Sequence, residues 1–456
     1  MKFKKTATVL TLVCIMVAVM LMGQVFSPDR PVMPAGGFSS IGNNVNQAAN
    51  TIKEARQGIV LPKFFQKFKI GSPKTGADVT IEQGSKAANV VVARADDTVK
   101  TTKLAERSKS AVSMDFASGK VAFEKNANER LPIASMVKLM TTLLVFESIA
   151  RGEIGLDDMI VVSENAASMG GSQAFLDANQ EYKVEELIKS IIVASANDSC
   201  VALAERIAGS VEGFVDLMNA RAAELGMIDT NYVNCTGLPA PNAYSSALDV
   251  ARVSRELFKH GKFFEYAGIW MFDFAHPSGR VTGLTNTNKL IKAYQGCDGG
   301  KTGFTQDAMH CLSSTAVRNG MRAIAVVIGS PDSKIRFFEN SELLNDMFGN
   351  YETRIAVRGG EQFGEAVAVP NSKEKQLTIS AKEDLAHFDR KRVGKELTTD
   401  VTLNAIVAPV RAGDIVGQVA LKADGEEIAR TDLLAMSDIN KLGYFDIIDE
   451  FVRKWN

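Results

Sequence analysis

The sequence predicts a mixed α/β domain followed by a small all-β domain. Strand-type segments occur near residues 111–124 and again near 298–328, and helix-type periodicity dominates between about 140 and 260. After about residue 352, the pattern changes to short alternating segments separated by turn residues. Because strands flank a long helical region, we expect one sheet assembled from distant parts of the chain and covered by a helical cluster.

The composition narrows the class of protein and of partner. With 456 residues and 46% hydrophobic content, the chain can form two or three domains with real cores. A formal net charge of -1 leaves no excess of Lys and Arg to displace counterions, which argues against nucleic acid as a partner. The four histidines are scattered, and neither H-E-x-x-H nor C-x-x-C occurs. We therefore expect no metal site and no cofactor.

Residues 1–26 have the pattern of an export segment. Lys2, Lys4 and Lys5 precede an apolar run from Ala7 to Gly23. The run is long for a cleaved signal peptide, slightly short for a transmembrane helix, and not followed by a clean A-x-A site. The segment is therefore a signal peptide or an N-terminal membrane anchor. Both alternatives place the rest of the chain on the outer face of the cytoplasmic membrane.

Residues 27–109 have the composition of a low-complexity spacer. Clusters of Pro, Gly, Asn, Gln and Lys are interrupted only briefly by apolar groups, such as those at 59–61 and 90–92. This composition suits a linker better than a domain, although a short helix around residues 45–56 is compatible with it.

The α/β domain is expected to span residues 110–351. It opens with two strands, 111–115 and 121–124, joined by a turn at 117–120. Its clearest helices are predicted at 184–194, 199–208 and 211–225, and its clearest buried strand at 322–328.

The β domain is expected to span residues 352–440. Residues 376–379 and 416–421 alternate, and Asp424-Gly425 predicts a tight hairpin turn before a returning strand at 426–430. Residues 441–456 predict an amphipathic helix with an aromatic-rich apolar face. Two placements are open for this helix, on a membrane surface or packed on the β domain. Its polar face carries three acids and two bases, which weakens the membrane interpretation.

The chain has five cysteines, of which Cys14 lies in the export segment. The other four permit two disulfides, but a chain of this size needs no covalent staple. We expect Cys200, Cys235, Cys297 and Cys311 to be buried, mostly reduced thiols.

Ser135 and Lys138 form the first candidate catalytic pair. Residues three apart lie on one face of a helix, and the apolar run that follows would bury this helix. A serine beside a buried amine is a candidate activated nucleophile. The alternative is an ordinary core helix, because S-x-x-K arises about once or twice by chance in a chain of this length.

Two further motifs strengthen the first alternative. Ser195-Ala196-Asn197 ends an apolar helix, and Lys301-Thr302-Gly303 follows a pair of glycines. The chain also contains a second copy of each pattern, beginning at Ser372 (S-x-x-K), Ser163 (S-x-N) and Lys74 (K-T-G). None of these copies has the expected surroundings. Ser372 lies in a charged segment, Ser163 is not preceded by a hydrophobic helix, and Lys74 lies in the spacer. The other three occur in order within one predicted domain.

This constellation resembles the penicillin-recognising serine enzymes, of the serine transpeptidase and β-lactamase fold. It is most similar to the low-molecular-mass D-alanyl-D-alanine carboxypeptidases, the penicillin-binding protein 5 type of peptidase family S11. Other segments that carry the resemblance are 114–120, 171–172, 236–238, 244–247, 286–288 and 298–305. A small β domain and a terminal amphipathic helix also belong to that family.

The resemblance implies a serine carboxypeptidase that acts on peptidoglycan stem peptides ending in D-Ala-D-Ala and is acylated by β-lactams. Ser135 would attack the penultimate D-alanine carbonyl, with Lys138 as base. Burial and the nearby Lys301 would lower the pKa of Lys138. Ser195 would relay the proton to the leaving amine. The N–H groups of Ser135 and Phe304 would form the oxyanion hole.

The remaining motif residues would bind the substrate. Asn197 would bond the substrate amide and hold Lys138, while Lys301 and Thr302 would bind the terminal carboxylate. Gly303 would let the strand approach the ligand. The cell membrane is a further expected partner, through the N-terminal segment and the C-terminal helix.

One departure and two rival functions remain. After Phe304-Thr305 the family has Ala-Gly, whereas here Ala308 is followed by Met309 and His310, which affects substrate preference. A β-lactamase of the same fold would need a dedicated deacylation base, and no E-x-x-L-N occurs between residues 197 and 301. A non-catalytic peptidoglycan-binding scaffold would be expected to have lost a motif residue.

Overall fold

The structure, a computed structural model, describes residues 103–443 together with residues 446, 448 and 452. The predicted export segment 1–26, with Cys14, lies outside the described residues, as do residues 27–102 of the spacer. Of the predicted helix at 441–456, the structure describes Asp446, Ile448 and Val452 as helical, and the other residues from 444 on lie outside it.

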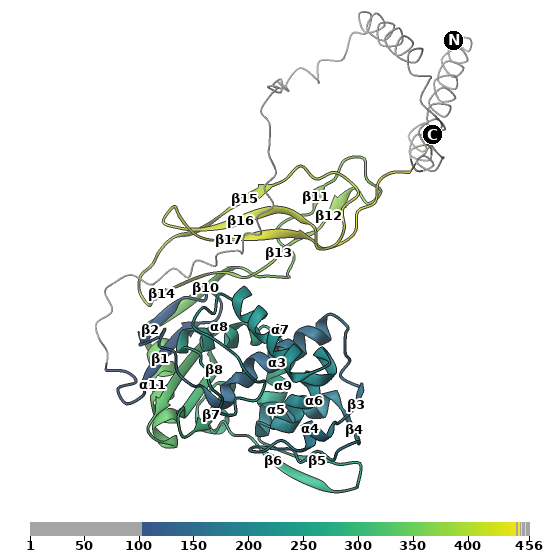
Figure 1. Cartoon of the computed structure of the whole chain (residues 1–456). Coiled ribbons are helices and arrows are strands. Elements are labelled where there is room, and N and C mark those ends of the chain that lie inside the picture. The colour runs from purple at the N-terminus through teal and green to yellow at the C-terminus, as the bar shows by residue number, and fades with distance from the viewer. Residues whose placement is uncertain (1–102, 444–445, 447, 449–451, 453–456) are drawn as a thin grey trace, which may run out of the picture. The chain divides into compact units, whose positions relative to one another are not determined.

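A five-stranded antiparallel sheet with the order β2-β1-β9-β8-β7 forms the centre of the first domain (Figure 1). Its strands are β1 (Ser110–Asp115), β2 (Val121–Lys125), β7 (Cys297–Thr305), β8 (Met309–Arg318) and β9 (Met321–Ser330). β1 pairs with β9, with Val112 opposite Val326. The prediction of one sheet built from distant strands is therefore confirmed, and β7 lies at its edge.

Both faces of β9 are buried, and each face belongs to a different core. Because side chains alternate along a strand, Ile324 and Val326 share one face and Ala325 lies on the other. Ile324 and Val326 pack in the larger cluster, which includes Leu143 and Val250 from two helices. Ala325 packs in a second cluster with Leu343 of α11 (Ser333–Asn350). This double burial explains the unbroken apolar run.

The helical cluster lies between β2 and β7 in the sequence and covers one face of the sheet (Figure 1). A 3-10 turn, η3 (Ala134–Val137), leads into it. Its helices are α3 (Lys138–Ala150), α4 (Glu164–Ala167), α5 (Val184–Ala194), α6 (Asn197–Ala208), α7 (Val211–Glu224), α8 (Ala247–Leu257), α9 (Gly261–Ala267) and α10 (Leu290–Ala293). Two small antiparallel sheets accompany them: β3 (Met159–Val161) with β4 (Glu181–Lys183), and the hairpin of β5 (Met271–Ala275) with β6 (Val281–Thr285).

The second domain contains a four-stranded sheet with the order β13-β17-β16-β15. Its strands are β13 (Ile379–Ala381), β15 (Leu397–Leu403), β16 (Ile415–Ala423) and β17 (Glu426–Ala435). The predicted hairpin is confirmed, because Ala423 faces Glu426 and both turn residues have positive φ, 50° at Asp424 and 85° at Gly425.

The predicted single strand at 376–379 is instead divided. Gln376–Leu377 forms β12 and pairs with β11 (Val367–Ala368), whereas β13 begins at Ile379 and pairs with β17. The alternation continues through residue 378, but the partners change there. Pairing partners cannot be read from alternation alone.

The boundary near residue 352 is close-packed. β10 (Tyr351–Val357) begins directly after α11 and pairs with β14 (Leu385–Arg390). The rings of Tyr351 and Phe388 stack, with centroids 5.0 Å apart, and both belong to the core cluster of α11. At the other end, the N–H groups of Arg107 and Ser108 donate to the Glu339 carboxylate on α11. The last residues of the predicted spacer therefore contact the first domain.

Within the described part of the chain, no helix is long and apolar enough to cross a membrane. Cys200, Cys235, Cys297 and Cys311 are all buried free thiols, as predicted.

Candidate active site

Ser135 and Lys138 lie where a 3-10 turn becomes a helix. Ser135 belongs to η3, and Lys138 is the first residue of α3. The Lys138 ammonium donates to Ser135 Oγ at 3.0 Å and to the carbonyl of Thr236 at 2.5 Å. Lys138 is fully buried, whereas Ser135 is partly exposed. The geometry holds the amine against a hydroxyl that solvent and substrate can reach.

The second lysine of the three motifs lies in the same buried region. Burial lowers the pKa of Lys138, and the weaker influence of Cys200, Cys235 and Asp198 opposes this change. Burial and then repulsion by Lys138 hold the pKa of Lys301 well below its usual value. Two buried ammonium groups so placed favour loss of a proton from the pair. Burial is the cause that lowers the pKa of Lys138, and Lys301, predicted as a second cause, is not among the groups that shift it.

Two glycines let backbone segments meet at η3. A Cβ atom on Gly303 of β7 would lie 2.6 Å from the carbonyl oxygen of Ile133, and one on Gly237 would lie 2.1 Å from that of Ala134. Real Cβ atoms do not approach so closely. The backbone of the serine turn is therefore the neighbour that requires glycine at position 303, whereas the sequence suggested only the ligand.

Replacing Gly237 by alanine is expected to lower the free energy of unfolding by about 3 kcal/mol or more and to displace the serine turn. The matched control is Gly226→Ala. Gly226 also has positive φ, 68° against 79° for Gly237, but no atom lies within 4 Å of its Cβ position. The control should cost only the roughly 1–2 kcal/mol of a left-handed alanine. Urea unfolding measures both, and equal losses would contradict the steric explanation.

The S-x-N motif joins two helices. Ser195 caps the end of α5 in the left-handed region, with φ 66°, and Asn197 begins α6. Both residues are 3% exposed, and Ser195 Oγ and Asn197 Oδ1 have no hydrogen-bond partner among the described residues. Buried polar atoms without partners are rare, and at a candidate site they are available to a ligand.

The predicted bond from Asn197 to Lys138 is not among the hydrogen bonds of the described residues. Asn197 Nδ2 instead donates to the carbonyl of Gly170 at 2.7 Å. The Thr236 carbonyl is the second partner that holds Lys138. Thr236 carried part of the family resemblance, but no sequence pattern marked its carbonyl as a partner of Lys138.

Asp198 is a further residue to which the sequence assigned no role. Its buried carboxylate accepts the N–H groups of Ala174 and Leu176, at 3.0 and 3.1 Å. The N–H of Asn197 donates to the carbonyl of Ser172. These bonds fasten the loop at residues 170–176 to the start of α6, so the loop and the S-x-N motif form one unit.

The K-T-G motif lies on edge strand β7, which packs against η3. Lys301 Nζ donates to the carbonyl of Thr302, and Thr302 Oγ1 donates to Thr287 Oγ1 at 2.8 Å. Phe304 is 57% exposed, and its ring stacks on His310 with centroids 4.4 Å apart. His310 is one of the residues at which the chain departs from the family pattern, so the departure changes the surroundings of Phe304.

Arg336 is a cation at this site that no sequence motif indicated. It lies on α11, and its Nη1 donates to the carbonyls of Gly303 at 3.1 Å and Cys311 at 3.4 Å. Its side chain forms no ion pair among the described residues, and its buried Nε has no partner there. Burial lowers the pKa of Arg336, an effect that a bound anion would offset. Arg336 lies well after Lys301 in the sequence and outside the three motifs, so no local pattern indicated its place at the site.

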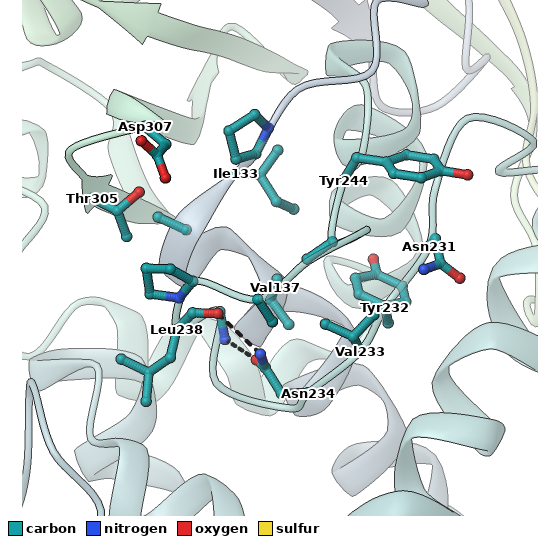
Figure 2. A pocket seen from close by; sticks show the side chains of 16 residues that line it. Ile133, Val137, Asn231, Tyr232, Val233, Asn234, Leu238, Tyr244, Thr305 and Asp307 are labelled. Carbon is teal, nitrogen blue, oxygen red and sulfur yellow. Dashed lines mark hydrogen bonds between the residues drawn. The ribbon is translucent and has the colours of Figure 1, made fainter.

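A pocket of about 230 Å³ lies beside the serine turn (Figure 2). Asn231, Tyr232 and Tyr244 of the loop at 231–244 lie on one side, and Thr305, the last residue of β7, and Asp307, in the turn that follows, lie on the other. Its lining residues are Pro132, Ile133, Ala134, Val137, Asn231, Tyr232, Val233, Asn234, Gly237, Leu238, Pro239, Ala240, Ala243, Tyr244, Thr305 and Asp307. Among the described residues, no group of His, Cys, Asp or Glu is arranged to hold a metal ion.

Comparison with known proteins agrees with this architecture. Residues 97–332 match the family described as D-alanyl-D-alanine carboxypeptidase, and residues 351–441 match the penicillin-binding protein 5 C-terminal domain. D-alanyl-D-alanine carboxypeptidase DacF of Bacillus subtilis is 38% identical over 79% of this chain and 92% of its own length. DacC of Escherichia coli is 33% identical over 74% and 86%. Penicillin binding protein 5 of Haemophilus influenzae superimposes with a TM-score of 0.58 at 30% identity, over 75% of this chain and 100% of that one.

Fold and sequence together define a penicillin-recognising serine peptidase. The chain belongs to the peptidase S11 family of D-alanyl-D-alanine carboxypeptidases. It is a serine-type hydrolase that removes the terminal D-alanine from peptidoglycan stem peptides.

Proposed function

We propose that Ser135 is the nucleophile and Lys138 its base in this carboxypeptidase. The observation that carries the proposal is the 3.0 Å contact between Lys138 Nζ and Ser135 Oγ at a buried amine of lowered pKa. In its neutral form the amine can accept the serine proton as Oγ attacks. The new bond joins Oγ to the carbonyl carbon of the penultimate D-alanine, and the peptide C–N bond breaks.

The proton then passes to the leaving amine through Ser195. The unpartnered Ser195 Oγ supports this role, because a relay must be free to accept and to donate. The terminal D-alanine leaves, and water hydrolyses the ester at Ser135. The N–H groups of Ser135 and Phe304 stabilise the oxyanion, a contribution of about 3–4 kcal/mol per donor.

The residues that we assign to substrate binding lie on β7, α6 and α11. Lys301 and Thr302 bind the terminal carboxylate, and Arg336, a buried cation without an acid partner among the described residues, adds positive charge beside them. Asn197 forms a hydrogen bond with the substrate amide. Its Oδ1 atom supports this role, because it has no hydrogen-bond partner among the described residues. Gly303 allows β7 to lie against the serine turn.

β-Lactams are proposed as covalent inhibitors that acylate Ser135. We also propose that the protein is exported and attached to the outer face of the cytoplasmic membrane through residues 1–26, with residues 441–456 as a second attachment. The supporting observations are the basic and apolar pattern of the first segment and the aromatic apolar face of the second.

The test uses the full-length protein, a pentapeptide ending in D-Ala-D-Ala and a fluorescent penicillin. D-Alanine should be released, and peptide mass spectrometry should place the penicilloyl group on Ser135. An adduct on Ser195 would contradict the assignment. Turnover of the adduct within seconds would favour the β-lactamase alternative, and a folded protein without D-alanine release would favour the scaffold.

A further inference from the structure

The segment Asn286-Thr287-Asn288, directly after β6, has no part in the mechanism proposed above. The N–H of Thr287 donates to the carbonyl of Val193 at 3.1 Å, in the last turn of α5 and just before Ser195. The hydroxyl of Thr287 accepts a hydrogen bond from Thr302 of the K-T-G motif at 2.8 Å. One residue therefore joins α5, which leads into the S-x-N motif, to β7.

The asparagines on either side fix the position of Thr287. Asn286 Nδ2 donates to the carbonyl of Ala267, the last residue of α9, at 3.0 Å, and its Oδ1 accepts the N–H of Asn288 at 2.9 Å. Asn288 Nδ2 donates to the carbonyl of Gly299 on β7 at 3.1 Å. Both asparagines are buried. Because buried hydrogen bonds hold the backbone on both sides, the Thr287 oxygen has a fixed place beside β7.

The direction of the bond between the two hydroxyls conflicts with carboxylate binding. A hydroxyl has one proton to donate, and Thr302 donates its proton to Thr287. An ionised carboxylate only accepts hydrogen bonds, so Thr302 can bind it only after this proton has turned away from Thr287. A proton from Thr287 is then needed between the two oxygens. Thr287 is partly exposed, and no acceptor for its proton is found within the described part of the chain, so the hydroxyl can turn.

We propose that Thr287 is a positioning residue for the carboxylate site. When the substrate binds, the hydroxyl of Thr287 donates to Thr302 Oγ1, and the hydroxyl of Thr302 donates to the terminal carboxylate. Both hydroxyls rotate about their C–O bonds, and no O–H bond breaks. Each hydrogen bond in this chain strengthens the next, because the carboxylate polarises both. The inference rests on the proposed function, which places the carboxylate at Thr302.

The test measures KM and kcat for release of D-alanine from the pentapeptide. Thr287→Val keeps the shape of the side chain and removes its proton. It should raise KM about three- to ten-fold, the contribution of one neutral hydrogen bond. Since the carboxylate is bound in the ground state and the transition state alike, kcat should stay within about two-fold of the wild-type value. Thr287→Ser keeps a hydroxyl and should restore the wild-type KM.

A double-mutant cycle separates positioning from a general structural effect. Thr302→Val should raise KM about ten-fold or more, because it removes a hydrogen bond to a charged group. Adding Thr287→Val to this variant should change KM less than about two-fold, because Thr287 no longer has a hydroxyl to orient. The matched control is Thr285→Val. Thr285 is an exposed threonine at the end of β6 whose hydroxyl has no hydrogen bond among the described residues, and the control should have the wild-type KM.

Two results would overturn the inference. The first is a wild-type KM in Thr287→Val when Thr302→Val is impaired, and the second is a double variant in which the two effects multiply. A wild-type KM in Thr302→Val would instead contradict the carboxylate site of the proposed function. Absence of D-alanine release by the folded wild-type protein would contradict the function itself.

Discussion

The Ser135→Ala variant is expected to form no penicilloyl adduct and to release D-alanine at least about 10⁴-fold more slowly than the wild type. Without Oγ, no ester can form, and the buried amine of Lys138 loses its hydroxyl partner. Gel fluorescence after incubation with a labelled penicillin measures the first effect, and a coupled D-alanine assay measures the second.

The chain offers its own control for this variant. Ser372→Ala removes the serine of the other S-x-x-K sequence, and both activities should survive. Ser372 Oγ donates to the carbonyl of Val369 and accepts the N–H of Lys375, so it stabilises a turn. Penicillin labelling that persists in Ser135→Ala, or that disappears in Ser372→Ala, would show that the nucleophile has been misassigned.

The Lys138→Met variant is expected to acylate about 10²- to 10⁴-fold more slowly, the contribution of a positioned base. Methionine keeps much of the side-chain volume and removes a buried amine, so the free energy of unfolding should not fall. Loss of acylation with retained stability would separate chemistry from folding. A variant that acylates at the wild-type rate would exclude Lys138 as the base.

The pH dependence of acylation gives a second test of the same residue. Only the neutral amine accepts a proton, and burial lowers the pKa of Lys138. The acylation rate of the wild type should therefore rise as the pH rises through this lowered pKa, and level off before the ordinary lysine range. Lys138→Met should lack this rise. A wild-type rate that still increases at the ordinary lysine pKa would contradict the role of burial.

Local patterns predicted much of the fold and the three motifs. Helix α5 has the predicted bounds, and the hairpin at Asp424-Gly425 is confirmed, because periodicity and turn chemistry act within a few residues. The edge strand β15 was missed, since six of its seven residues are exposed and show no burial alternation. The division between β12 and β13 was missed because it depends on which strand lies alongside.

At the site, the missed features are those made by tertiary contact. The Thr236 carbonyl meets Lys138, and Arg336 meets the carbonyl of Gly303, across long stretches of sequence. Neither contact has a local pattern. Gly303 is an intermediate case, because the motif marks the position, but only the packing shows that the backbone of Ile133 requires it.

The pairing of β1 with β9 has a consequence for the order of folding. The first and the last strands of the sheet along the chain, β1 and β9, lie side by side, and β7 and β8 are joined to β1 only through β9. Contacts between distant parts of a chain form slowly. Lys301 therefore cannot reach the serine turn until almost the whole domain has been made. A nascent chain that ends before residue 330 should contain Ser135 and Lys138 but react with no penicillin.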